Sequence, residues 1–287
     1  MIFRFKQDPV TVLTPPRGWW NIQWRELWTY RDLAYLFAKR DVSVIYTQTI
    51  LGPVWFLIQP VLTALVFSVV FGHVAKIGTD GLPHFLFYMT GILMWNYFRG
   101  IMVGTADSLR AISPMASKIY FPRLLVPLSF PLSNLVYFFW NAVILAVFLA
   151  YYRLQGAPVC PSRYILFLPV AIAYTALTAV GTGLWWAALT VKYRDLSFTL
   201  GFFEQIWLYA TPIVYPISAV TDPVFKAILL LNPVTQSVEW ARVMLLGVPP
   251  TYLTMRMQLT GWGISILVFL IGLALFNRAQ RTFVDVV

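Results

Sequence analysis

Residues 124–152 read LLVPLSFPLSNLVYFFWNAVILAVFLAYY, a stretch without one aspartate, glutamate, lysine or arginine. Three further gaps of this kind lie at 42–75, 164–191 and 257–277. Each gap is at least as long as the roughly 20 residues that an apolar helix needs to cross the ~30 Å hydrocarbon core of a bilayer. Only a chain whose solvent is lipid can omit charge on this scale, so the sequence predicts an all-α integral membrane protein.

Composition supports one membrane domain with short connections. The 287 residues are 59% hydrophobic and 11% charged, well below the charge of ordinary soluble domains. The net charge of +10 collects at helix ends, which indicates membrane topology rather than a nucleic-acid partner. A single cysteine, Cys160, excludes an intrachain disulfide and a cysteine metal cluster. No cleavable signal peptide is visible, so we expect the first span to act as its own insertion signal.

The chain divides into three parts. Residues 1–21 are rich in proline and predict an irregular segment. Residues 22–45 predict an amphipathic interface helix, with Arg25, Asp32 and Lys39 on one face and apolar side chains such as Phe37 opposite. Residues 46–287 form the membrane domain, with six expected spans at about 51–74, 83–107, 125–151, 164–191, 196–216 and 258–277.

Between the fifth and sixth expected spans, residues 218–247 are too apolar for a loop and too broken to cross the membrane. Two short helices, 218–231 and 234–247, are split by Asn232-Pro233. Apolar runs of 10–14 residues fit re-entrant or interfacial helices. With both termini cytoplasmic, most lysines and arginines fall on the inner side, and the outer side holds Lys76, Arg153, Arg163, Lys226, Arg242 and Arg256. We therefore expect the re-entrant pair on the outer face.

The sequence contains none of the catalytic or nucleotide-binding motifs considered below. No glycine-rich loop ends in Gly-Lys-Ser/Thr, so the chain is not expected to bind ATP in that way. His73 and His84 are the two histidines, and no carboxylate cluster stands near them in the sequence. No Ser/His/Asp constellation can be assembled. We therefore expect no catalytic residue, no metal and no cofactor in this chain.

Aromatic residues make up 17% of the chain, and many fall in mid-span. Lipid contact and interfacial belts are their usual roles. The alternative is a pore lined by ring faces, which stack on the apolar C–H faces of sugars without holding a polymer at one site. Candidates for such a channel are Phe56, Phe202 and Trp207.

Two charged side chains interrupt the expected spans, and each is costly in a membrane. Arg99 and Glu204 must face protein or water rather than lipid, either as an interhelical ion pair or in a polar pathway. A basic loop near 110–123 is the second place where charged residues stand out between the apolar segments. It is either an ordinary cytoplasmic loop or a short coupling helix for a soluble partner, carried by Arg110, Ser113, Lys118 and Arg123.

Five strings resemble one family, the permease subunits of ABC exporters for cell-surface polysaccharides such as O-antigen, capsule and teichoic acid. The resemblance covers nearly the whole chain from about residue 30. The strings occur in the family's order: LGPVWFLIQP at 51–60, YFPRLLVPL at 120–128, YRDL at 193–196, TPIVYP at 211–216, and LNPVT at 231–235 followed by Glu239 and Arg242.

The resemblance implies a homodimer of six-span subunits in the bacterial inner membrane, bound to two copies of a separate ATPase that holds ATP and Mg. It implies a cytoplasmic coupling helix and a channel lined by both subunits. The substrate would be a polysaccharide on undecaprenyl diphosphate, O-antigen before teichoic acid or capsule. The re-entrant pair, with Asn232, Pro233, Glu239 and Arg242, would form a periplasmic gate. Glu239 and Arg242 also have the spacing of a local ion pair.

Other classes fit less well. A related permease for small lipids or drugs would share the fold, although dense aromatics favour a glycan. An ion-driven transporter would show internal repeats with paired broken helices, and a membrane glycosyltransferase would need grouped acidic residues. Neither pattern is present in the sequence.

Overall fold

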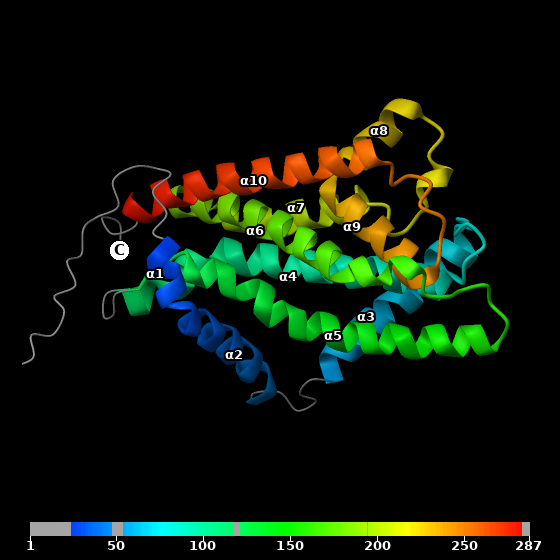
Figure 1. Cartoon of the computed structure of the whole chain (residues 1–287), viewed down its shortest axis with the longest axis horizontal. Helices are drawn as coiled ribbons and strands as arrows, with labels where there is room; N and C mark the ends of the chain where they lie inside the picture. Colours follow the sequence, from blue (N-terminus) through cyan, green and yellow to red (C-terminus); the bar gives the residue numbers. More distant parts are fainter. Residues whose placement is uncertain (1–23, 48–53, 117–120, 194, 283–287) are drawn as a thin grey trace, which may run out of the picture.

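The computed structural model describes residues 24–47, 54–116, 121–193 and 195–282. Every regular element in these ranges is helical. The long helices run along one axis, with α1 and the end of α10 at one end of the bundle and α8 and the start of α10 at the other (Figure 1). The elements are α1 (Trp24–Thr29), α2 (Arg31–Thr47), α3 (Val54–Phe67), η1 (Ser68–Val74), α4 (His84–Ala116), α5 (Leu125–Leu154), η2 (Arg163–Phe167), α6 (Leu168–Lys192), α7 (Leu196–Tyr209), η3 (Ile217–Ala219), α8 (Pro223–Leu231), α9 (Pro233–Ala241), η4 (Arg242–Leu246) and α10 (Met255–Thr282).

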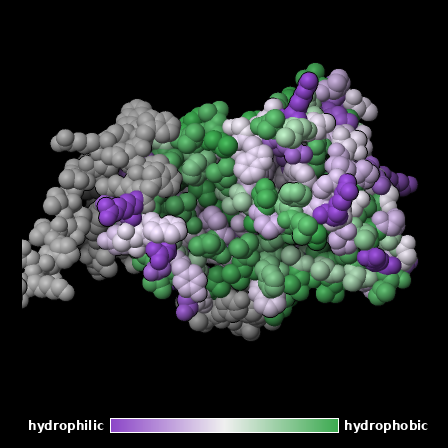
Figure 2. Space-filling view, viewed as in Figure 1, coloured by the Kyte–Doolittle hydropathy of each residue, from purple (hydrophilic) through white to green (hydrophobic). Residues whose placement is uncertain are grey.

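Four helical segments are long and apolar enough to cross a membrane, which makes the chain a multi-pass membrane protein. They are Leu57–Val74, Leu125–Leu154, Arg163–Lys192 and Met255–Gln280. They correspond to the first, third, fourth and sixth expected spans. Apolar side chains cover the middle of the face seen in Figure 2, and hydrophilic side chains gather towards its two ends.

The second and fifth expected spans take a different form. Of the second expected span, residues 84–107 lie in α4, which has 33 residues and continues to Ala116 through the region expected to begin a separate coupling helix. A proline inside a helix removes one backbone hydrogen bond. The helix nevertheless continues through Pro114, whose neighbours include good helix formers. Residues 196–216 form α7, whose 14 residues span roughly 21 Å at 1.5 Å per residue, and a turn. Spanning by α4 and α7 therefore remains a prediction.

The expected interface helix at 22–45 is divided in two. A turn at Tyr30 separates α1 from α2. The Thr29 hydroxyl donates to the Arg25 carbonyl at 2.9 Å, an interaction that bends helices. The predicted polar face is exposed at Arg25, Asp32 and Lys39. On the opposite face Phe37 is buried, and its ring centroid lies 5.7 Å from that of Phe121 beside α5.

Small residues bring α6 and α10 into close backbone contact. A Cβ added at Gly181 would lie 2.7 Å from the Cα of Phe269, and one at Gly272 would overlap the Gly181 carbonyl oxygen. Hydroxyls join the same helices, because Thr178 and Ser265 share a hydrogen bond of 2.8 Å. In lipid the hydrophobic effect does not drive helices together. They associate instead through close packing at small residues and through hydrogen bonds between hydroxyl side chains.

We expect Gly181→Ala to push α6 and α10 apart, because its methyl group would overlap backbone atoms that cannot rotate away. Overpacking of this kind costs about 1–3 kcal/mol. Thermal unfolding of the detergent-purified protein should shift to lower temperature. The matched control is Gly263→Ala on α10, where an added Cβ meets nothing within 4 Å. Equal stability of the two variants would contradict the close-packing explanation.

Candidate functional site

A line of polar side chains runs along one exposed face of α4. Asn96, Arg99, Asp107 and Arg110 are spaced three or four residues apart around Val103, which places them on one side of the helix. Arg99, Asp107 and Arg110 are exposed, and Arg110 lies 3.7 Å from Asp107. We call these four residues together with Glu204 of α7 the polar seam. On a helix that crosses a membrane, as α4 is predicted to do, exposed charges require water or protein beside them rather than lipid.

The two charges that interrupt the expected spans pair with each other. The Arg99 Nε donates to a Glu204 carboxylate oxygen at 2.7 Å, joining α4 to α7 across 105 positions of sequence. The Glu204 side chain is only 10% exposed, whereas that of Arg99 is 50% exposed. Among the described residues, the other two guanidinium nitrogens of Arg99 make no hydrogen bond or ion pair. The pair therefore holds α7 against α4, and it leaves N–H donors of Arg99 exposed along the polar seam.

A second ion pair is buried at the end of the bundle that holds α8 and α9. Arg242 donates to Glu239 at 2.6 Å and to the Ile213 carbonyl at 3.2 Å. Its guanidinium carbon lies 3.6 Å from the centroid of the Phe87 ring on α4. The Arg242 side chain is 2% exposed, so the local ion pair anticipated from the spacing is present and closed to solvent. This arginine fastens α9 and η4 to α4 and to the turn after α7.

A family model described as "ABC-2 type transporter" matches residues 33–246, more than half of the chain. The chain belongs to the ABC-2 type transporter family. The family assignment confirms the resemblance to ABC permeases, and it makes this chain a transmembrane subunit of an ABC transporter.

Curated relatives of this ABC-2 chain carry a common name. The O-antigen export system permease protein RfbA of Myxococcus xanthus is 28% identical over 211 residues, which are 73% of this chain and 78% of the relative. Two proteins of the same name from Klebsiella pneumoniae are 24% and 23% identical over 258 residues, 89% of this chain and 95% of each relative. The match therefore extends over almost the full length of the Klebsiella proteins.

The predicted gate residues of this ABC-2 protein join α7 to α9. The Asn232 side-chain oxygen accepts from the Val234 backbone N–H at 3.0 Å, so Asn232 caps α9 with Pro233 at its first position. The same oxygen accepts from the Trp207 indole N–H at 3.1 Å. The amide nitrogen of Asn232 donates to the Thr211 hydroxyl at 3.2 Å. A gating role for this junction remains a prediction.

The three candidate channel aromatics occupy different environments. Phe202 on α7 is 67% exposed and free to face a channel or lipid. Trp207 is partly buried, with its ring centroid 4.9 Å from that of Phe98 and 5.1 Å from that of Phe203. Its contacts are therefore those of a packing residue that holds α7 to α4. The Phe56 side chain lies outside the described residues, and its role remains a prediction.

Two of the candidate coupling residues, Arg110 and Arg123, lie at the opposite end of the bundle from α8 and α9. Arg110 is exposed near the end of α4. Arg123 donates to the backbone carbonyl of Gln280 at 2.6 Å, which ties the start of α5 to the end of α10. Lys118 and the side chain of Ser113 lie outside the described residues. The contact with an ATPase stays a prediction for all four.

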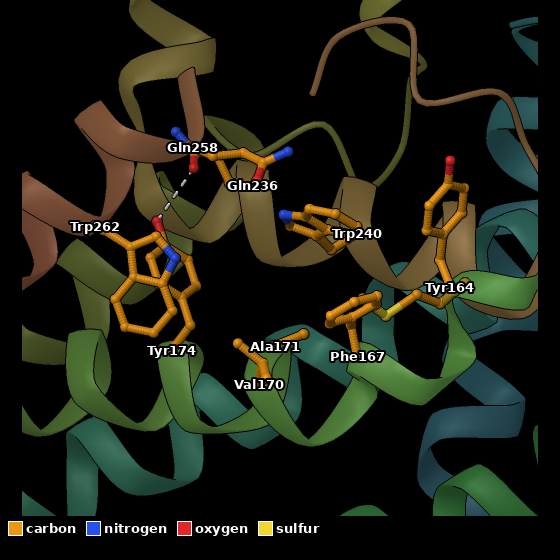
Figure 3. Close-up of a pocket in the computed structure, with 10 residues that line it drawn as sticks. Tyr164, Phe167, Val170, Ala171, Tyr174, Gln236, Trp240, Gln258 and Trp262 are labelled. Carbon is orange, nitrogen blue, oxygen red and sulfur yellow. Dashed lines mark hydrogen bonds between the residues drawn. The ribbon is translucent and has the colours of Figure 1, made fainter. Parts of the chain in front are cut away.

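An aromatic pocket that the sequence did not predict lies at the α8–α9 end of this permease. It has a volume of about 320 Å³ and lies between η2, α6, α9 and α10 (Figure 3). Tryptophan, tyrosine and glutamine at span ends are signals for such a site, but no periodicity relates segments so far apart. The aromatic pocket is lined by Tyr164, Phe167, Val170, Ala171, Tyr174, Gln236, Trp240, Met244, Gln258 and Trp262.

Proposed function

We propose that this chain is the channel-forming subunit of an ABC exporter for O-antigen carried on undecaprenyl diphosphate. The observation that carries the proposal is the match to named O-antigen export permeases over 89% of this chain and 95% of theirs. Export of teichoic acid, capsule, small lipids or drugs by this chain is not favoured by these relatives.

The assembly proposed for this function is a homodimer in the bacterial inner membrane with two copies of a cytoplasmic ATPase. Each subunit contributes six spans, with α4 and α7 completing the four clearly apolar segments, and both termini are cytoplasmic. ATP and Mg are bound by the partner, and its motion enters through Arg110, Ser113, Lys118 and Arg123. Nucleic acid has no part in this scheme.

The polar seam supports a path for polar cargo along α4 and α7. Glu204 is nearly buried while its partner Arg99 is half exposed, so the exposed donors lie on the open side of the pair. A polysaccharide offers hydroxyl acceptors for such donors, and its lipid carrier offers phosphate. Contact at several weak positions lets a polymer advance, whereas one strong site would hold it.

Deletion of the gene for this chain tests the proposal in its own host. We expect surface O-antigen to disappear from lipopolysaccharide gels while lipid-linked polymer accumulates on the inner side of the membrane. Reintroduction of the intact gene should reverse both effects. A deletion strain with normal O-antigen at its surface would refute the function.

The seam makes a prediction about water access. After Cys160→Ser removes the exposed native thiol, Val103→Cys on the seam side of α4 should react with a membrane-impermeant maleimide in the assembled exporter. The matched control is Val147→Cys on α5, where valine is 63% exposed on a clearly apolar span. That thiol should stay unlabelled because it faces lipid. Equal labelling at the two positions would remove the argument that the seam borders an aqueous path.

A further inference from the structure

The aromatic pocket lies apart from the polar seam, and its own chemistry indicates what it holds. Its walls are the rings of Tyr174, Trp240 and Trp262 together with apolar side chains from η2 and α6 (Figure 3). A volume of about 320 Å³ is at the lower end of the range for ligand pockets. The pocket is therefore large enough for part of a ligand.

The amide nitrogens of Gln236 and Gln258 already have partners. The Gln236 amide nitrogen donates to the backbone carbonyls of Leu230 at 3.1 Å and Met257 at 2.9 Å. Its oxygen accepts from the Tyr174 hydroxyl at 3.5 Å, and the Gln258 amide nitrogen donates to the Leu253 carbonyl at 3.0 Å. A saccharide here would bury hydroxyls with few partners, which is costly. A hydrocarbon chain needs none.

The pocket is open on an apolar flank of the bundle. Its lining residues Phe167 and Val170 are 55% and 50% exposed. Leu166 on η2 and Leu259 on α10 are still more exposed and flank the lining residues in sequence. All four belong to segments apolar enough to span a membrane. The opening therefore faces the lipid acyl region rather than bulk water.

A cation lies beside one of the residues that line the pocket. The guanidinium carbon of Arg163 lies 5.3 Å from the centroid of the Tyr164 ring, which lines the pocket. Arg163 is the first residue of the Arg163–Lys192 span, and Arg256 lies in the first turn of the Met255–Gln280 span. Residues at the ends of spans lie at the depth of lipid headgroups, where arginine meets phosphate.

We propose that the aromatic pocket binds one anionic phospholipid, with a hydrocarbon chain between the rings and the headgroup phosphate on Arg163. The lipid comes from the leaflet that borders the α8–α9 end of the bundle. Because Gln236 and Trp240 belong to α9, a bound chain would support the helix that carries Glu239. Lipid would thus stabilise the junction of α9 with α6 and α10, whichever polymer the transporter moves.

Photolabelling tests the site. The intact transporter is placed in vesicles containing phosphatidylglycerol with a diazirine in its acyl chain, and labelled peptides are identified by mass spectrometry. We expect labelling concentrated on the pocket segments 164–174, 236–244 and 258–262. Val170→Trp should abolish it by filling the opening. Val147→Trp, an exposed valine on α5 outside the pocket, should leave it intact.

The contact between Arg163 and the lipid headgroup is tested by a separate variant. Arg163→Ala should reduce pocket labelling by phosphatidylglycerol about fivefold, the effect of losing one cation near a lipid surface. It should reduce labelling by photoreactive phosphatidylcholine much less, because the choline cation offsets the charge of that lipid's phosphate. The proposal is overturned if Val170→Trp labels like Val147→Trp, if the pocket labels no more than the exposed face of α5, or if both lipids respond equally to Arg163→Ala. None of these results depends on export.

Discussion

Arg242→Ala is expected to destabilise the α8–α9 end of the protein by about 3–5 kcal/mol, the cost of leaving a buried charge without its partner. The Glu239 side chain is only 11% exposed, and its carboxylate would lose its cation. The stacking of the guanidinium on Phe87 would be lost as well. Arg242→Lys should recover only part of the stability, because an ammonium cannot both stack flat and donate to Glu239 and the Ile213 carbonyl. The measurement is thermal unfolding in detergent, together with protease sensitivity of the segment after α7.

Two variants control this experiment. Arg153→Ala removes an exposed arginine at the same end of the molecule and should have little effect. Glu239→Ala should destabilise to a similar degree as Arg242→Ala, since either leaves one charge of the pair buried. If Arg242→Ala left stability unchanged and removed export alone, the buried ion pair would not be the role of Arg242. A contact of Arg242 with the diphosphate of the lipid carrier, or a role in the predicted gate, would then be favoured.

Arg99→Ala is expected to abolish most export and to lower stability. Loss of a hydrogen bond to a charged group costs about 1.5–3 kcal/mol, and Glu204 would be left nearly buried. The double variant Arg99→Ala/Glu204→Ala removes that stranded carboxylate, so folded yield should recover. Export should remain low, because the exposed donors of the seam are gone. Surface O-antigen and purified yield are measured side by side.

The outcome separates two roles of this pair. A purely structural pair would make export recover with yield in the double variant, and this result would exclude Arg99 from the path. As a control for charge in general, Arg31→Ala removes an exposed arginine of α2 outside the seam. It should change neither quantity appreciably.

Patterns that are local in sequence predicted much of this fold. The charge-free stretches correspond to α5, to η2 with α6, and to α10, because hydropathy over some 20 residues decides membrane insertion. Asn232-Pro233 marked the break between α8 and α9, since the asparagine caps and the proline starts a helix. The turn at Tyr30 and the continuation of α4 to Ala116 were not anticipated. Both depend on side-chain bonds and neighbours rather than on periodicity.

The site was less accessible to sequence reasoning. Arg99 and Glu204 stood out as expensive residues, but their contact joins positions 105 apart and depends on how α4 and α7 pack. The sequence does not distinguish Trp207 from other mid-span aromatic residues. Its hydrogen bond from the indole N–H to the Asn232 side chain depends on how α7 packs beside α9. The aromatic pocket forms only where η2, α6, α9 and α10 pack together, which brings Trp240 of α9 and Trp262 of α10 into one lining. Tertiary packing decides such contacts, and a single sequence does not encode them in its spacing.

Transport by the purified system is the most direct test of the account. This chain and its partner ATPase would be reconstituted in vesicles loaded with undecaprenyl-diphosphate-linked O-antigen, and polymer reaching the opposite leaflet would be measured with a sugar-specific lectin. We predict ATP-dependent transfer that requires this chain and is lost with Arg99→Ala/Glu204→Ala. Transfer at the same rate in vesicles lacking this chain, or an intact exporter that moves no lipid-linked polymer, would contradict its role as the path for O-antigen.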